Sequence, residues 1–537
     1  MKYKRTIYLG LIVCLVAATA FATPEAEYGK ISKAWILHAD GSQEYRHYME
    51  LTLFTHTAMN DVYGESFITY NPDYQELKIH ASYTRQKDGT IIQTPDNAFV
   101  EGLPYFAANA PAYNQLKEMV VVHTGLELGA TIYLDYSIIT KAGYYPALDI
   151  NEKLQETSPV KTYEVSVSVP TNTPFTWQLY GDDTKAKETT KDGNNLFQWT
   201  LNNIPASSRE PFQPRNLDEM PRLIASSYTS SQEALGIMKE RFKASGSYEC
   251  KTFGAYLTEN ITNEEEKVKT ILEHVVNHLD YCPIPIQETG YSIRDIDESL
   301  RSAYGTLAEK TYLLNVLLNA AGIPSEVVAV FPSPFNSEAC GLSAIKDWAV
   351  KTTVAGKDQY LSAISLTPSS ITTRGALDRV VTLENQQISL TAEPTIIQIN
   401  DTVKVSQKPS VNDLVVCTLP TPAEGIDTWR MNTLSSHRSS LFELPSLLKE
   451  EVTYTVLPEK DLRLLTSTEE IVIEKPFGKL TRTIQPGIDA TLVKYTLELN
   501  KQQFSPSEYS EIRTLINAWV NPNNRVLLWE FTEKEKK

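Results

Sequence analysis

The cysteines and histidines are the residues of this sequence whose chemistry depends most on spacing. Outside the first 22 residues there are four cysteines, and their spacing matches no zinc pattern and contains no CxxC pair. Cys250 and Cys282 lie nearest in sequence, so an oxidising compartment would permit a disulfide, while four buried free thiols remain the alternative. After His278 only His437 remains. A cysteine–histidine nucleophile pair within residues 280–370 is therefore excluded by composition.

His274 and His278 are four residues apart on an expected helix, so both could reach one metal ion. Projected at 100° per residue, they lie at the edge of the apolar stripe and on its solvent side. Glu273 precedes the first histidine, so no zincin pattern is present, and we predict surface histidines. The sequence also contains no GxSxG elbow, P-loop or dinucleotide fingerprint. It therefore predicts neither a metal nor a cofactor.

The first residues have the pattern of a secretory signal. A basic start at residues 1–5 precedes an apolar run at 6–18 and the small residues Ala20 and Ala22. This pattern predicts a cleaved signal peptide at 1–22, with an uncleaved anchor as the alternative. We expect a protein secreted across the inner membrane, periplasmic or associated with the cell surface, with no transmembrane segment after cleavage. The net charge of −16 and pI near 5.1 exclude nucleic acid as an expected partner.

The remaining chain predicts three domains. Residues 23–215 carry short alternating strands separated by turn signals, which is typical of a β-sandwich; one expected hairpin pairs 119–123 with 130–140. The proline-rich stretch 205–221 is interpreted as a linker. Residues 225–375 change to helices followed by an antiparallel sheet, an α+β domain. Residues 380–537 predict a second β-rich domain with one helix, capped by Ser505.

Two helices of the α+β domain have clear sequence signals. Asn263 is expected to cap a helix with an apolar stripe from Val268 to Leu279. Thr306 and Glu309 form a capping-box pattern at the start of a second helix, Leu307–Ala321, which Gly322 ends.

This second helix carries a family resemblance. Its frame comprises Tyr304-Gly305-Thr306-Leu307, Lys310 and the tail Gly322-Ile323-Pro324. It resembles the core of bacterial transglutaminase-like proteins, papain-like thiol enzymes that carry an uncharacterised β-sandwich in front and a β domain behind. In that family a cysteine opens this helix, a histidine opens the next strand and an aspartate follows a hairpin. The resemblance places Leu307, Asp347 and Ser362 at those three positions, so the catalytic triad is lost.

The resemblance implies a cleft lined by Tyr304, Thr306, Asp347, Trp348 and Ser362. It favours a non-catalytic protein that binds a peptide, a glycan or an envelope protein, or whose β domains serve as interaction surfaces. The alternative is an active cysteine protease or transglutaminase that uses Cys282 or Cys340. A threonine nucleophile at Thr306 is disfavoured, because a helix cap already engages its hydroxyl group.

Overall fold

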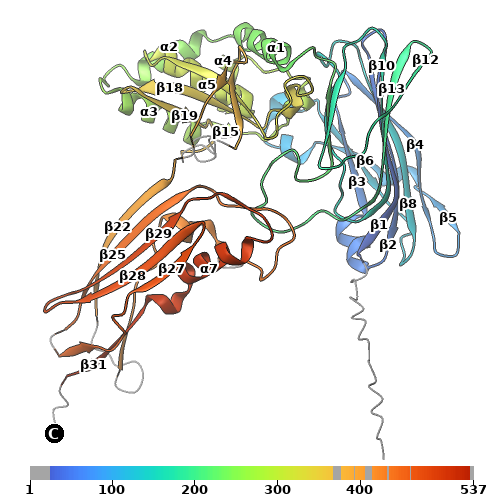
Figure 1. Ribbon diagram of the computed structural model, residues 1–537. Helices are drawn as coiled ribbons and strands as arrows, with labels where there is room; N and C mark the ends of the chain where they lie inside the picture. The colour runs from blue at the N-terminus through green and yellow to red at the C-terminus, as the bar shows by residue number, and fades with distance from the viewer. Residues whose placement is uncertain are drawn as a thin grey trace, which may run out of the picture.

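The computed structural model describes residues 24–366, 377–391, 393–405, 414–431, 434–459 and 461–532, in three domains (Figure 1). The expected signal peptide 1–22 lies outside the described residues. As the sequence predicts, β-rich domains flank an α+β domain. No helix in the described part of the chain is long and apolar enough to cross a membrane.

The N-terminal domain is built on an eight-stranded sheet in the order β12-β13-β10-β1-β2-β8-β4-β5. Only the pair β1–β10 is parallel. The strands are β1 (Ala26–Leu37), β2 (Gln43–Leu53), β4 (Gln75–Arg85), β5 (Ile91–Gln93), β8 (Thr131–Thr140), β10 (Val160–Pro170), β12 (Lys187–Lys191) and β13 (Asn194–Ile204). The turn between β4 and β5 contains Gly89 at a φ of 92°, a conformation that glycine adopts without strain.

Two three-stranded sheets complete this domain. One has the order β3 (Glu65–Tyr70), β7 (Lys117–Val122) and β6 (Phe99–Gly102). The other has the order β11 (Thr176–Tyr180), β14 (Arg222–Ser226) and β9 (Asp149–Lys153). The expected hairpin is wrong, because β7 and β8 lie in different sheets. Strand β14 follows the expected linker and still pairs with β9 of the first domain.

In its described residues, the central domain packs five helices against a five-stranded antiparallel sheet of order β19-β18-β17-β20-β21. The helices are α1 (Ser231–Ala244), α2 (Tyr248–Leu257), α3 (Glu264–His278), α4 (Ile296–Ser302) and α5 (Leu307–Ala320). The strands are β17 (Ser325–Phe331), β18 (Asp347–Val354), β19 (Lys357–Leu361), β20 (Arg379–Thr382) and β21 (Gln387–Ile388). Helix α5 contacts β17, β18 and the helices α1, α2, α3 and α4, which explains why it is buried on nearly every side.

Strands β20 and β21 correct the expected boundary between the central and C-terminal domains. The sequence assigns the chain from residue 380 onward to the C-terminal domain, whereas β20 pairs with β17 in the central sheet. The C-terminal sheet begins at β22 (Thr395–Lys404) and continues through β25 (Leu448–Leu457), β29 (Thr491–Leu499), β28 (Gly478–Pro486) and β27 (Ile471–Lys475). A smaller sheet contains β23 (Leu414–Thr418), β31 (Val526–Phe531) and β26 (Leu462–Leu464).

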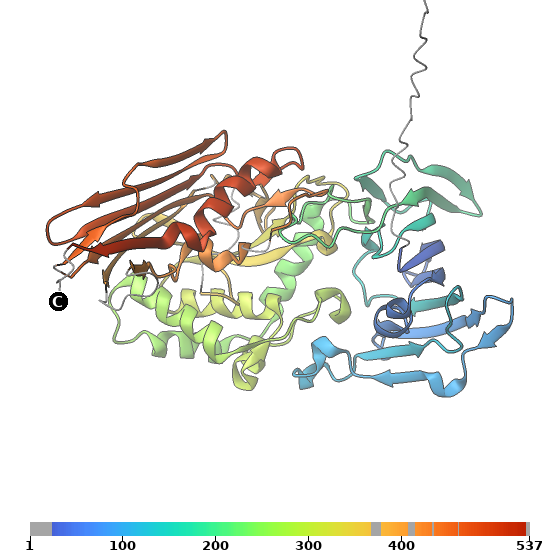
Figure 2. The same cartoon turned by 90° about the horizontal axis from the view of Figure 1, so that it is seen from below.

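One helix, α7 (Tyr509–Val520), packs on the C-terminal sheet (Figure 2). Its apolar face enters the core of this domain. It begins one turn later than the expected Ser505 cap. The Glu508 carboxylate instead accepts from the Ser505 backbone amide at 2.9 Å, and residues 506–508 form a turn. The existence of this helix is thus predicted correctly, but its first turn is not.

Candidate functional site at the start of helix α5

Helix α5 begins with the capping box that the sequence predicts. The Thr306 hydroxyl accepts from the Glu309 backbone amide at 3.4 Å, and the Glu309 carboxylate accepts from the Thr306 amide at 2.9 Å. Two of the free amide donors at the helix start are therefore satisfied within the chain. Leu307, the first helical residue, is half-buried and packs against the apolar cluster that contains Phe242 and Trp348.

Glu309 is a fully buried carboxylate with donors from two domains. It accepts from the Arg294 backbone amide at 2.8 Å and lies 3.4 Å from the Arg294 guanidinium. It also accepts a short hydrogen bond from the hydroxyl group of Tyr113, a residue of the N-terminal domain. The Arg294 guanidinium lies 4.3 Å from the ring centre of Tyr304, which places a cation over its aromatic face. These contacts satisfy a charge that would otherwise be costly to bury.

A segment of the N-terminal domain covers this part of the central domain. It contains two short helical turns, η3 (Tyr105–Ala107) and η4 (Pro111–Tyr113). The backbone amide of Ala112 donates to the Tyr304 hydroxyl at 2.9 Å. Apolar residues of the segment form a small core with Cys282 and Ile284. Tyr304 is therefore half-buried under this segment, and Thr306 is buried, with 4% of its surface exposed.

Asp347 and Ser362 lie at the same end of two neighbouring strands. Asp347 opens β18 and Ser362 follows β19, and these strands are antiparallel with Val350 opposite Leu361. Asp347 is half-buried, and burial raises the pKa of its carboxyl group. Its Oδ1 accepts from the Trp348 backbone amide at 2.9 Å. The Ser362 hydroxyl accepts from the Ile364 amide at 3.3 Å. The two side chains thus engage local backbone amides.

Trp348 belongs to the core of the central domain. Its side chain is 5% exposed and packs edge-on against Phe242, with ring centres 5.8 Å apart. The alternation of side chains along β18 turns Trp348 away from the face that Asp347 occupies. The structure therefore assigns Trp348 a packing role, where the sequence resemblance implies a place on the cleft wall.

The four described cysteines are free and buried, so Cys250 and Cys282 form no disulfide. Cys282 is 3% exposed, and burial raises the pKa of its thiol; the charged groups around it are Arg294, Glu309, Asp280 and Lys310. Cys340 is 1% exposed, and burial raises its pKa to about 12. Nucleophilic cysteines require the opposite shift, which an adjacent imidazolium or a helix N-terminus provides.

The two histidines of α3 lie close together. Their rings are 5.1 Å apart, His278 is exposed, and His274 is half-buried against the ring of Phe253. Burial lowers the pKa of His274. Among the residues that the structure describes, no group of three histidine, cysteine or acidic side chains is placed to hold a metal ion.

The most informative contacts at this site were missed from the sequence. Tyr113 and Arg294 carry no local signal, because their partner Glu309 lies 196 residues from Tyr113 and 15 from Arg294. Tyr113 stands in an irregular segment between strands. Its aromatic character alone does not distinguish it from the 28 tyrosines of the chain.

Family models match each of the three domains. Residues 251–359 match the model of the transglutaminase-like superfamily, and the flanks match two domains of unknown function, DUF3857 at 39–208 and DUF3858 at 413–529. A solved structure from Parabacteroides distasonis is 62% identical, with a TM-score of 0.90, covering 94% of this chain and 99% of that one. The chain belongs to the transglutaminase-like superfamily.

That relative is described as a "putative protease". A second solved structure, described as a "putative cysteine protease" from Cytophaga hutchinsonii, is 12% identical with a TM-score of 0.19 over 41% of this chain and 75% of that one. No curated protein matches the chain. Within this transglutaminase-like chain, the predicted order of the three domains is confirmed.

Proposed function

We propose that this protein is a non-catalytic transglutaminase-like protein, exported to the cell envelope, where it binds a peptide, a glycan or a protein partner. The observation that carries the proposal is the start of α5. A leucine stands at the first helical position, and the neighbouring threonine and glutamate close the cap with their own side chains. A thiol at this position would have its thiolate stabilised by the helix dipole, and an imidazole would activate it.

The losses at the other two family positions act in the same direction. Asp347 cannot replace a histidine as general base for a thiol that is not there, and Ser362 carries no charge to orient a ring. Hydrolases of this mechanistic type that lose their triad accelerate the reaction by at most ~10³–10⁴-fold over the uncatalysed reaction in water. The packing supports a scaffold role for the core, because α5 is buried against the central sheet and the N-terminal domain packs over its start.

The alternative is a working thiol protease or transglutaminase that uses Cys282 or Cys340. It is favoured by the description of the 62%-identical relative as a protease. It is disfavoured by the raised pKa and burial of both thiols.

Alkylation with iodoacetamide at pH 7, followed by mass spectrometry, tests the proposal. The folded wild-type protein is expected to keep all four cysteines unmodified over the time in which an exposed thiol reacts completely. Two variants supply reference rates. Leu307→Cys places a thiol at the helix start, and Leu128→Cys places one at a residue that is 44% exposed. The helix dipole should lower the pH midpoint of alkylation for Leu307→Cys relative to Leu128→Cys.

Turnover is measured in parallel, as hydrolysis of casein and as incorporation of an amine into it. No turnover is expected from the wild-type protein. Rapid alkylation of Cys282 or Cys340 in the folded protein, with turnover that Cys282→Ala or Cys340→Ala abolishes, would overturn the proposal and establish the enzyme.

A further inference from the structure

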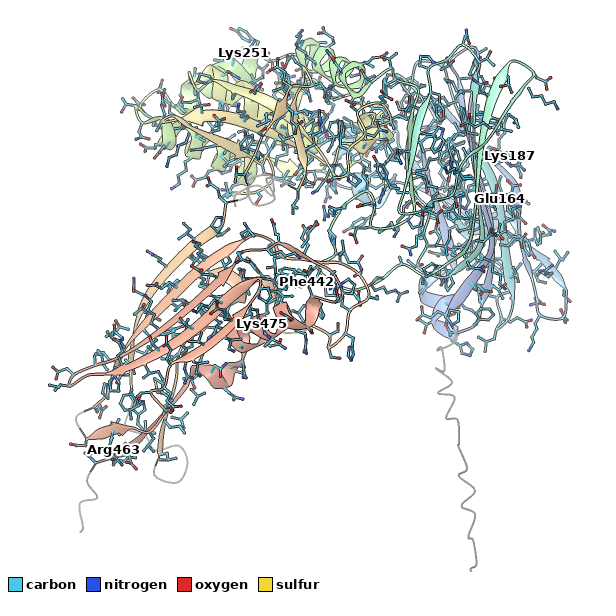
Figure 3. All side chains as sticks on the ribbon, in the orientation of Figure 1. Glu164, Lys187, Lys251, Phe442, Arg463 and Lys475 are labelled. Carbon is cyan, nitrogen blue, oxygen red and sulfur yellow. The ribbon has the colours of Figure 1, made fainter. Side chains whose placement is uncertain are left out.

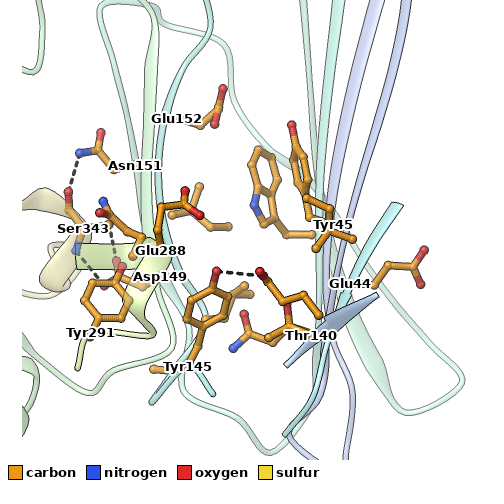
Figure 4. Close-up of a pocket in the computed structure, with 18 of the residues that line it drawn as sticks. Glu44, Tyr45, Thr140, Tyr145, Asp149, Asn151, Glu152, Glu288, Tyr291 and Ser343 are labelled. Carbon is orange, nitrogen blue, oxygen red and sulfur yellow. Dashed lines mark hydrogen bonds between the residues drawn. The ribbon is translucent and has the colours of Figure 1, made fainter. Parts of the chain in front are cut away.

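A cavity of about 360 Å³ lies between the N-terminal sheet and the central domain (Figure 4), and none of its lining residues belongs to the start of α5. One wall consists of side chains from β1, β2, β4 and β8, including Trp35, Tyr45 and Ile138. The facing wall combines β9 with the short turn η5 (Ile286–Thr289) and a loop of the central domain. Its volume is at the lower end of the range for small-molecule sites, about 300–1,000 Å³.

Aromatic rings stand on both sides of this cavity. On the sheet wall the ring centres of Trp35 and Tyr45 are 5.2 Å apart. On the facing side Tyr145 and Tyr291 are arranged edge-to-face at 6.2 Å. Figure 4 shows Tyr45 on the opposite side of the cavity from Asp149 and Tyr291. Such rings offer both apolar contact and a negative π face to a ligand.

Two of the carboxylates on the facing wall are already engaged. Glu152 forms an ion pair with the buried Lys33 at 2.6 Å. Asp149 accepts from the Ser343 backbone amide at 2.9 Å and from its hydroxyl at 2.5 Å. All of the donors to Asp149 are neutral, and no cation pairs with it in the described part of the chain. Burial raises the pKa of Asp149 to about 6. Its negative charge is thus held in the wall without being cancelled.

Glu288 is the carboxylate that lines the cavity without a partner. Its backbone carbonyl accepts from the Tyr144 hydroxyl at 2.7 Å. Its carboxylate oxygens, in contrast, accept no hydrogen bond and form no ion pair among the described residues. Burial alone raises the pKa of this carboxyl group to about 7. The Glu288 side chain is half-buried, so a ligand that places a charged donor beside it in the cavity forms a charge-assisted hydrogen bond shielded from bulk water.

We propose that this cavity binds a small organic ammonium ion, whose charged group pairs with Glu288 and whose carbon body packs against Trp35 and Tyr45. An anion is repelled by Asp149 and by the ionised form of Glu288. A neutral ligand gains no charge–charge attraction from either carboxylate. An ammonium ion satisfies the carboxylate and also gains attraction from the aromatic faces.

The shared chemistry, a protonated primary amine beside a compact body, occurs in amino sugars and at peptide N-termini. The cavity is built from residues other than those at the start of α5. The inference therefore stands whether or not the α5 site is catalytic, and thiol alkylation does not bear on it.

Isothermal titration calorimetry on the full protein tests this inference with two matched pairs of probes. Glucosamine is compared with glucose, and phenylalaninamide with N-acetylphenylalaninamide, so that each pair differs in its ammonium group. At least one ammonium probe is expected to bind saturably, and its neutral counterpart at least tenfold more weakly. Binding of glucosamine alone identifies an amino-sugar site, and binding of phenylalaninamide alone identifies a peptide amino group.

The variants locate the binding. Glu288→Gln keeps the shape of the side chain and should weaken binding of the ammonium probe at least tenfold. Trp35→Ala, on the opposite wall, removes an apolar contact and should also weaken binding of that probe. Glu188→Gln, at an exposed position on β12 of the same sheet, should bind as the wild type does. The inference is overturned if no probe binds at millimolar concentration, if neutral probes bind equally well, or if Glu288→Gln leaves affinity unchanged.

Discussion

At the scale of single residues, the polar groups at the start of α5 are bonded to one another and to neighbouring backbone amides. Thr306 and Glu309 are occupied by each other's backbone amides, and Glu309 is further held by Arg294 and Tyr113. Catalytic groups, in contrast, need at least one interaction left open for the substrate. By that criterion Glu288 in the cavity is more available than any residue at the start of α5.

The raised pKa of Glu288 predicts that the free energy of unfolding depends on pH. A glutamate in an unfolded chain has a pKa of about 4.3, whereas burial raises the pKa of Glu288 in the folded protein to about 7. Between those values the folded protein holds a proton that the unfolded chain has released, so the free energy of unfolding decreases as pH rises. The effect is on the order of 1–3 kcal/mol across that window. Glu288→Gln removes it and should therefore raise the melting temperature relative to wild type at pH 8 but not at pH 4.5.

Differential scanning fluorimetry from pH 4.5 to 8 in the absence of amines measures this difference. Glu188→Gln, whose carboxylate is exposed, is the matched control and should show no pH-dependent gain. A constant difference between Glu288→Gln and wild type at every pH would contradict the raised pKa.

The sequence predicts individual residues well where their partners are local. The capping box of α5 follows from a threonine and a glutamate three residues apart, and Asn263 caps α3 by the same logic. Trp348 and Tyr304 have partners that arrive from elsewhere in the chain. Their aromatic character predicts burial or binding equally, and only the folded chain places one in the core and the other against Arg294.

At the scale of elements, the expected linker 205–221 is a strap that packs into the C-terminal domain. The Glu210 carboxylate accepts from the backbone amides of Ser439 and Ser440, and the Arg438 guanidinium donates to the Pro211 carbonyl at 2.6 Å. Phe212 packs on the C-terminal core with its ring 5.9 Å from that of Phe442. Figure 3 labels Phe442 at the end of the C-terminal domain that faces the other two domains.

Removing the Phe212 ring tests whether the strap stabilises the C-terminal domain. Phe212→Ala deletes a partly buried aromatic side chain, so we expect a loss of about 1–3 kcal/mol in the unfolding free energy of this domain. Urea unfolding followed by the fluorescence of Trp519 and Trp529, in variants in which the other tryptophans are replaced by phenylalanine, reports on this domain. Ile488→Ala, at a side chain that is 99% exposed, should leave the midpoint in place. An equal midpoint for Phe212→Ala would show that the strap is only a connection.

Element types follow from local periodicity, and pairing between elements does not. The strands at 379–382 and 387–388 lie at the start of the region expected to be β-rich, but the sequence places that region in the wrong domain. An apolar strand could pair in either sheet, and the pairing of β20 with β17 is what assigns it to the central domain. The same reason explains the wrong hairpin between β7 and β8, and the strand β14 that the sequence leaves unassigned.

At the scale of the whole molecule, the N-terminal and central domains share hydrogen bonds at three separate places. Asn151 donates to the Ser343 carbonyl at 2.8 Å beside the cavity, and Tyr144 donates to the Glu288 backbone carbonyl. At the start of α5, Tyr113 donates to Glu309. These contacts connect the N-terminal domain to η5, to α5 and to the loop of Ser343 in the central domain. Local unfolding of either domain therefore leaves polar groups of the other without partners. We expect the two domains to unfold in one cooperative transition.

Tyr113→Phe tests this coupling, because it deletes one hydroxyl group and keeps the ring. Glu309 would lose a donor inside a closed core, at a cost of about 1–3 kcal/mol. The shared transition should therefore move down by several degrees in differential scanning calorimetry, or split in two, while the C-terminal transition stays in place. Tyr105→Phe, in the same segment but 91% exposed, is the matched control and should change neither transition. If Tyr113→Phe leaves the calorimetric profile unchanged, the contact at the start of α5 does not couple the two domains, and the segment over it is an independently stable cover.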